Sequence, residues 1–230
     1  MGYPECHARL NCLSPYYSEI AFRNYLIVKQ KYLLYKNDDL NTDIFCESHL
    51  INEHKMIAVV FAQMAIESFF NDYAATCLGD DEFYDNFDKL DILGKFQLIT
   101  KFILKDNLDK GCEPYNSLKS LIKLRNSYIH NKSVEYKSAN INNSIDDDEI
   151  NDIPLDVMYK SELKSYKNML QVAETAIKAI AKVTKYFDAR DEHVSAKFNF
   201  FGFISNPIGL NINDIQKEIK NFGITYEIQI

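Results

Sequence analysis

Apolar side chains recur every three to four residues along five segments of the chain, and this spacing predicts helices. The five segments cover residues 16–36, 52–78, 88–105, 115–130 and 158–190. Asn52 is a favourable N-cap for the second helix, and Gly79 is a favourable residue to end it. Because apolar residues surround much of this second helix, we expect it to lie at the centre of the fold.

The pattern changes after residue 190. Apolar and aromatic residues alternate with polar ones over 196–204 and again over 224–230, which predicts two strands. Residues 211–222, between them, have a helical pattern that Gly223 closes. We therefore expect a mainly α protein, with a helical extension over 1–43, an antiparallel helical bundle over 44–190 and a small strand–helix–strand appendix over 191–230.

Composition agrees with a folded chain of few, long elements. The 230 residues include only 7 Gly and 5 Pro, while 47% are apolar and 26% are charged. A disordered protein would lack this apolar content. The net charge is −7, we find no signal peptide, and the longest apolar stretch, 56–66, is too short to cross a bilayer. These features predict a cytoplasmic protein that does not associate with membranes.

The five cysteines are scattered and form no C-x-x-C pair. Cys6, His7 and Cys12 are close in sequence, but no second pair of ligands has the spacing of a zinc site. We therefore expect no metal and no cofactor.

Two charged stretches leave alternatives open. The polar segment 138–152 includes an acidic run at 146–149 and is either a solvated insertion or a regulatory element. A row of lysines on the helix at 158–190 is either a solvent face or a ridge that binds phosphates. Its members are Lys160, Lys164, Lys167, Lys178, Lys182 and Lys185.

The most informative stretch is at the end of the helix at 115–130. Arg125 falls on or beside the apolar face of this helix, while Asn126 and His130, four residues apart, share another edge. An arginine against a core face is costly unless an anion meets it. That anion is either an acidic side chain, for which Glu67 is a candidate, or the phosphate of a ligand.

The spacing of Arg125, the polar Asn126 and His130 near a helix end resembles the RX4–6H motif of the HEPN superfamily. The order of the surrounding helices is also similar over about residues 44–190: an apolar helix with Glu67, a helix with Lys95, the motif helix and a long amphipathic helix. One departure is Lys132, which occupies the position of the tyrosine that is modified in one regulated variant of the family.

This resemblance implies a helical bundle that forms a homodimer, with the two motifs meeting at a cleft. Many HEPN proteins are metal-independent endoribonucleases, often toxins or abortive-infection effectors of prokaryotic antiviral defence, some of which have a neutralising partner. By position, Arg125 and His130 would be catalytic and Asn126 would orient them. Other members are catalytically silent modules for dimerisation or for binding a nucleotide or a protein.

The residue types fit RNA cleavage. The 2′-hydroxyl of RNA is the nucleophile, so the enzyme must supply a base, an acid and positive charge for the phosphorane. Histidine can fill either proton role, and arginine can donate to two phosphate oxygens. The products would be a 2′,3′-cyclic phosphate and a 5′-hydroxyl. Lys119, Lys123 and Lys132 could bind the RNA backbone.

Other interpretations remain open at this point. Tyr128 either stacks on a base or packs in the core. If the motif is accidental, Arg125 would pair with Glu67 and His130 would cap the end of its helix, where a cation is favoured. The chain would then be a helical interaction protein without an active site.

Overall fold

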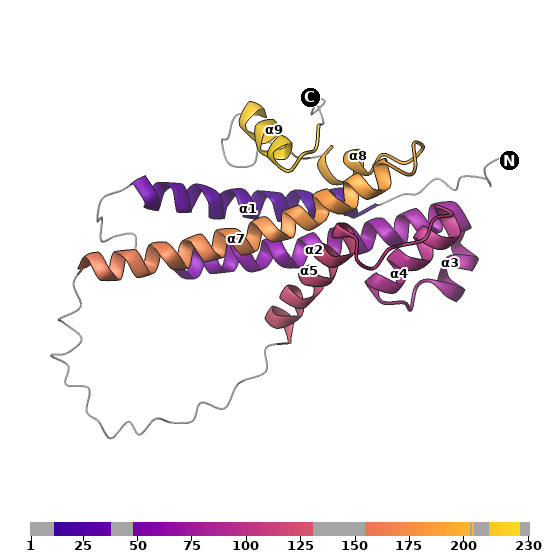
Figure 1. Cartoon of the computed structure of the whole chain (residues 1–230), viewed down its shortest axis with the longest axis horizontal. Helices are drawn as coiled ribbons and strands as arrows, with labels where there is room; N and C mark the ends of the chain where they lie inside the picture. The colour runs from indigo at the N-terminus through magenta and orange to yellow at the C-terminus, as the bar shows by residue number, and fades with distance from the viewer. Residues whose placement is uncertain (1–11, 38–47, 131–154, 203, 205–211, 226–230) are drawn as a thin grey trace, which may run out of the picture.

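The computed structural model describes residues 12–37, 48–130, 155–202, 204 and 212–225, and every regular element in these ranges is helical. Three long helices lie side by side: α1 (Ser14–Asn37), α2 (Ser48–Leu78) and α7 (Leu155–Asp188) (Figure 1). They match the helices predicted at 16–36, 52–78 and 158–190, so the mainly α class is confirmed. The prediction that Asn52 is an N-cap is wrong, because α2 begins at Ser48, one turn earlier. Gly79 follows α2 with a φ of 86°, as the prediction of a helix end requires.

The helix predicted at 88–105 is divided differently in the structure. A short helix, α3 (Asp80–Asn86), precedes it, and α4 (Ile92–Leu98) continues into a π-helical turn, η2 (Ile99–Ile103). The start is set by Asp91, whose Oδ1 accepts a hydrogen bond of 2.6 Å from the backbone N–H of Gly94. The sequence thus predicted this element but placed its start about one turn too early.

The strand predicted at 196–204 is wrong, because Ala196–Phe201 form a helix, α8. The side chain of Ser195 accepts from the N–H of Phe198, which caps this helix. Ala196 and Phe200, four residues apart, are both buried, and Phe201 is buried beside them. The buried residues thus follow the spacing of a helix, although the aromatic residues also alternate as in a strand.

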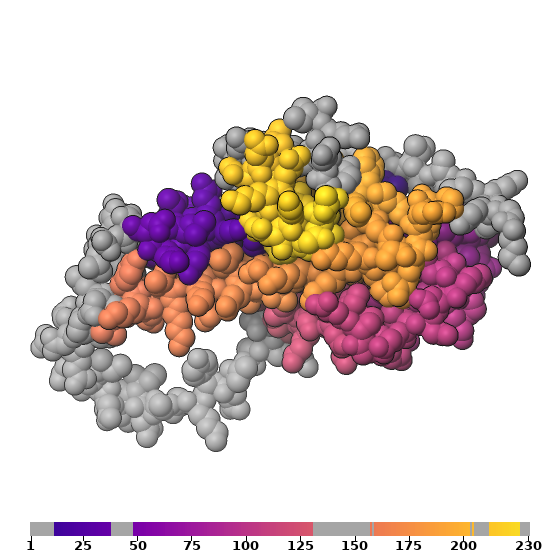
Figure 2. All heavy atoms as spheres, turned by 45° about the horizontal axis from the view of Figure 1, so that its top comes forward, coloured from indigo at the N-terminus to yellow at the C-terminus, as the bar shows by residue number. Residues whose placement is uncertain are grey.

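The helix predicted at 211–222 is confirmed by α9 (Ile212–Asn221), and Gly223 follows it with a φ of 73°. Ile215 and Ile219 bury one face of α9, and Tyr25 of α1 donates a hydrogen bond of 2.6 Å to Glu218 on it. Figure 2 shows α9 seated over α1 and α7. Of the second predicted strand, residues 226–230 lie outside the described residues, as do 131–154 with the acidic run.

The core is richest in aromatic side chains where α2, α4, α7 and α8 meet. Phe187 of α7 is fully buried at its centre, with ring centroids 5.1 Å from Phe69, 5.6 Å from Phe70 and 5.2 Å from Tyr73. Phe96 of α4 stacks on both Phe70 and Phe187. No helix in the described ranges has the length and apolar character to cross a membrane.

One ring between α1 and α2 makes stability depend on pH. His54 Nδ1 lies 2.6 Å from Asn24 Oδ1, and partial burial lowers the pKa of His54 from its ordinary value of 6.5. The unfolded chain therefore binds this proton more readily than the folded chain, so His54 destabilises the fold as pH falls below 6.5.

We expect the free energy of unfolding to fall between about pH 7.5 and pH 5, and His54→Gln to reduce this dependence. Urea denaturation at several pH values measures both. His54→Gln should reduce the pH dependence more than His193→Gln, which replaces an exposed histidine after α7 whose Nε2 lies 3.8 Å from Glu192 Oε1. An identical slope in wild type and His54→Gln would contradict the assignment.

Candidate functional site

The motif lies on α5 (Glu113–Ile129), which is anchored to the bundle by its first half. Pro114 is favourable in the first helical turn, and Leu118 and Leu121 are fully buried. Lys182 of α7 fixes this end further: its Nζ lies 3.0 Å from Glu113 Oε1 and donates to Ser117 Oγ over 2.9 Å. Lys178 of α7 also pairs with Glu174, at 2.7 Å. Two members of the lysine row of α7 therefore form ion pairs within the protein.

The second half of α5 is more exposed. The face that carries Leu118 and Leu121 continues as Arg125 and Ile129, at helical spacing. Arg125 is half-buried and Ile129 is 45% exposed, because the end of α5 projects beyond α2 and α7 (Figure 1). The side of α5 that faces the core is therefore partly exposed to solvent at Arg125 and Ile129.

The structure brings Arg125 and Asn126 together. Arg125 Nη1 donates a hydrogen bond of 3.1 Å to Asn126 Oδ1. His130 is the C-cap of α5, and its backbone N–H donates to the carbonyl of Asn126 over 2.9 Å. The imidazole of His130 is exposed. Because Arg125 and His130 are five residues apart, their side chains leave the helix about 140° apart, on either side of Asn126.

A polar row runs along the exposed edge of α5. Its members follow one another at intervals of four, three and four residues and are all exposed: Lys119, Lys123, Asn126 and His130. Residues at these intervals share one side of a helix. Two of its members, Lys119 and Lys123, are positively charged, and Lys132, predicted with them, lies outside the described residues.

Glu67 is not beside Arg125. It lies on α2 opposite α4, where its carboxylate is 3.9 Å from the ammonium of Lys95. Lys95 is buried and donates a hydrogen bond of 2.8 Å to Asn71 Oδ1. Among the described residues Arg125 forms no ion pair with a carboxylate. The suggested Arg125–Glu67 pair is therefore not formed, because a different cation occupies the place beside Glu67.

Tyr128 is half-buried against α2, where the ammonium of Lys55 lies 4.9 Å from the centre of its ring. Burial raises the pKa of Tyr128 and lowers that of Lys55. Sequence analysis did not identify Lys55 as a site residue. No local signal marks it, because its proximity to the motif helix depends on how α5 crosses α2.

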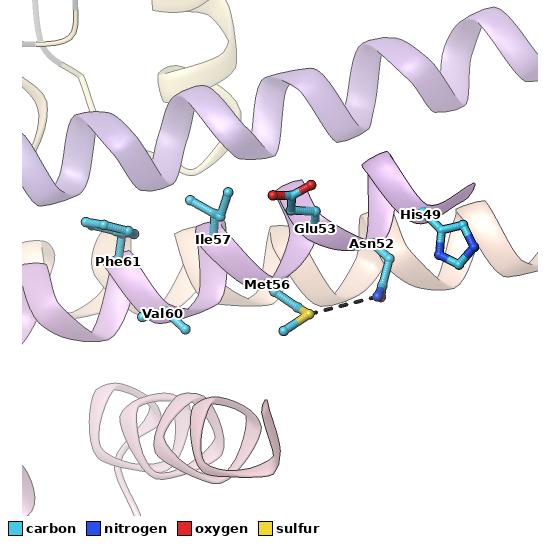
Figure 3. Close-up of a pocket in the computed structure, with 7 residues that line it drawn as sticks. All are labelled: His49, Asn52, Glu53, Met56, Ile57, Val60 and Phe61. Atoms are coloured by element: carbon cyan, nitrogen blue, oxygen red, sulfur yellow. Dashed lines mark hydrogen bonds between the residues drawn. The ribbon is translucent and has the colours of Figure 1, made fainter. Parts of the chain in front are cut away.

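A shallow apolar groove of about 310 Å³ lies along the first half of α2 (Figure 3). None of the motif residues lines it; its lining consists of His49, Asn52, Glu53, Met56, Ile57, Val60 and Phe61. Within the described ranges, no three His, Cys, Asp or Glu side chains are grouped as a metal site would need. Cys6 and His7 lie outside those ranges.

The arrangement on α5 can bind an anion and move a proton. Arg125 offers donors that no carboxylate of the described chain neutralises, and His130 offers an exposed imidazole, a group that can donate or accept a proton. Comparison of the chain with family models, curated proteins and solved structures finds no match.

Proposed function

We propose that this protein is a metal-independent endoribonuclease of the HEPN type, acting as a toxin or antiviral defence effector. The observation that carries the proposal is the setting of Arg125, which is half-buried on the core-facing side of α5 and bonded to Asn126 instead of a carboxylate. A guanidinium in this position favours an external anion, and exposed His130 at the end of the same helix can take or give a proton.

In this reaction His130 removes the 2′-hydroxyl proton or protonates the leaving 5′-oxygen. Arg125 stabilises the charge on the phosphorane, and Asn126 orients the guanidinium through its hydrogen bond. Lys119 and Lys123, on the same edge as His130, bind flanking phosphates.

Cleavage needs both an acid and a base, whereas one chain offers one motif histidine. We propose that a homodimer brings two copies of the motif together. The opposite directions of Arg125 and His130 on α5 support a site shared between two chains. Ile129, exposed beside Arg125, is an apolar residue that such a contact could cover.

The direct test is incubation of structured and unstructured RNAs with the purified protein in EDTA, followed by mapping of the product ends. We expect 2′,3′-cyclic phosphate and 5′-hydroxyl ends, because the nucleophile belongs to the RNA. An oligonucleotide with a single 2′-deoxy residue at the cleaved position should resist cleavage there. Cleavage of this oligonucleotide at an unchanged rate would contradict the mechanism.

A second candidate is a catalytically silent module that binds a partner protein. The apolar groove on α2, which is separate from the motif, favours this alternative. The same experiment distinguishes the two, since a silent module leaves every RNA intact.

A further inference from the structure

In the part of the chain that the structure describes, no carboxylate pairs with Lys55 of α2. Four other buried or half-buried lysines, Lys29, Lys95, Lys182 and Lys197, each lie beside a carboxylate. Lys55 is half-buried, and its ammonium donates a hydrogen bond of 2.5 Å to the neutral Asn52 Oδ1. Its other close contact is the ring of Tyr128, with Nζ 4.9 Å from the ring centre.

This environment leaves a positive charge only partly compensated. Loss of solvent lowers the pKa of Lys55, and no described carboxylate opposes the effect. A cation that has lost water gains most from an anion that arrives with a ligand. The amide of Asn52 and the face of Tyr128 hold the ammonium in place until that anion binds.

Lys55 lies against a residue of the motif helix, α5. Tyr128 and Arg125 are three residues apart on α5, so their side chains are neighbours on one face, separated by one turn. Lys55 contacts Tyr128 on this face, and Arg125 lies about one turn closer to the start of α5. His130 lies on the opposite side of the helix end. In the shared site, a strand whose scissile phosphate is held by Arg125 of one chain and His130 of the partner chain would extend from Arg125 toward Lys55 of the first chain.

We propose that Lys55 of α2 binds the backbone phosphate next to the scissile one in the RNA substrate. This inference rests on the proposed function and adds a contact from a second helix to the same site. Tyr128 then acts as a positioning residue that holds the ammonium, and no base need stack on it.

The test measures binding separately from cleavage. A single-stranded 2′-O-methyl oligonucleotide cannot be cut through its 2′-oxygen, so its affinity can be followed over a range of salt concentrations. We expect Lys55→Met to weaken binding about three- to tenfold. It should also reduce the slope of log affinity against log salt by about 0.7, the value for one phosphate contact on a single strand. Lys55→Arg, which keeps the charge, should retain the wild-type slope.

Lys101→Met is the matched control, because Lys101 also lies over an aromatic ring, 5.7 Å from the centre of Phe102, but is exposed on η2. It should leave both affinity and slope unchanged. On cleavable RNA, Lys55→Met should raise KM and change kcat little. Thermal unfolding confirms that each variant is folded, and a purely structural Lys55 would change Tm but not the salt slope.

The outcomes separate the inference from the proposed function. A wild-type slope in Lys55→Met, or an equal loss in Lys101→Met, overturns the role of Lys55 whether or not the protein cleaves RNA. A slope that depends on Lys55 in a protein that cleaves no RNA supports the phosphate contact and overturns the nuclease. Absence of RNA binding by the wild type overturns both.

Discussion

His130→Ala and Arg125→Ala should each lower the rate of RNA cleavage about 10²–10⁴-fold while the protein stays folded. Proton transfer by a positioned side chain contributes a factor of this size, and so does a charged donor to the transition state. Both residues lie at the open end of α5, away from the aromatic core, so the free energy of unfolding should change little. Single-turnover cleavage and circular dichroism measure the two effects.

His193→Ala, at another exposed histidine, is the control and should cleave RNA at the wild-type rate. Co-expression of the two inactive variants with different tags tests whether two chains share one site. The purified mixed dimer should recover part of the activity, because its site regains one guanidinium and one imidazole. A mixed dimer as inactive as its parents would exclude a shared site in which one guanidinium and one imidazole suffice, and full activity in either single variant would exclude the nuclease.

Phe187→Ala should lower the free energy of unfolding by about 3–5 kcal/mol, the cost of removing a fully buried aromatic side chain. Phe187 is fully buried and touches rings from α2 and α4, so its removal leaves a cavity between three helices. For a protein of this size the loss corresponds to a fall in Tm of about 6–20 °C.

Differential scanning calorimetry or urea denaturation provides the measurement. Phe102→Ala is the matched control, because Phe102 is 50% exposed and contacts only Lys101 among the ring contacts of the described residues. It should lower the free energy of unfolding by less than about 0.5 kcal/mol. Comparable losses in the two variants would show that the aromatic cluster is not the main source of stability.

The long helices were predictable because their apolar periodicity extends over many turns. The segments at 16–36, 52–78 and 158–190 lie within a few residues of α1, α2 and α7. The shortest α-helix was not, since the six residues of α8 offer less than two turns of pattern. There, the caps by Ser195 and Asp188 and the burial of Phe200 and Phe201 decide the conformation, and these depend on tertiary contacts.

In the candidate site, too, the relations within one helix were predictable and the contacts between helices were not. The relation of Arg125, Asn126 and His130 follows from their spacing on one helix, so sequence alone placed them at its end. The neighbours of that helix did not follow from spacing. Whether Glu67 or Lys55 lies close to the motif depends on where α5 crosses α2, and the structure selects Lys55.

The attachment of α5 has a mechanical consequence. Leu118, Leu121 and the Lys182–Glu113 pair hold the first half of α5, and the nine residues from Leu121 to His130 span about 14 Å. A tilt of about 5° of the helix about Leu121 displaces His130 by roughly 1 Å, a misplacement large enough to slow a reaction. Changes remote from the motif, at the junction with α7, could therefore alter the alignment of His130 without touching it.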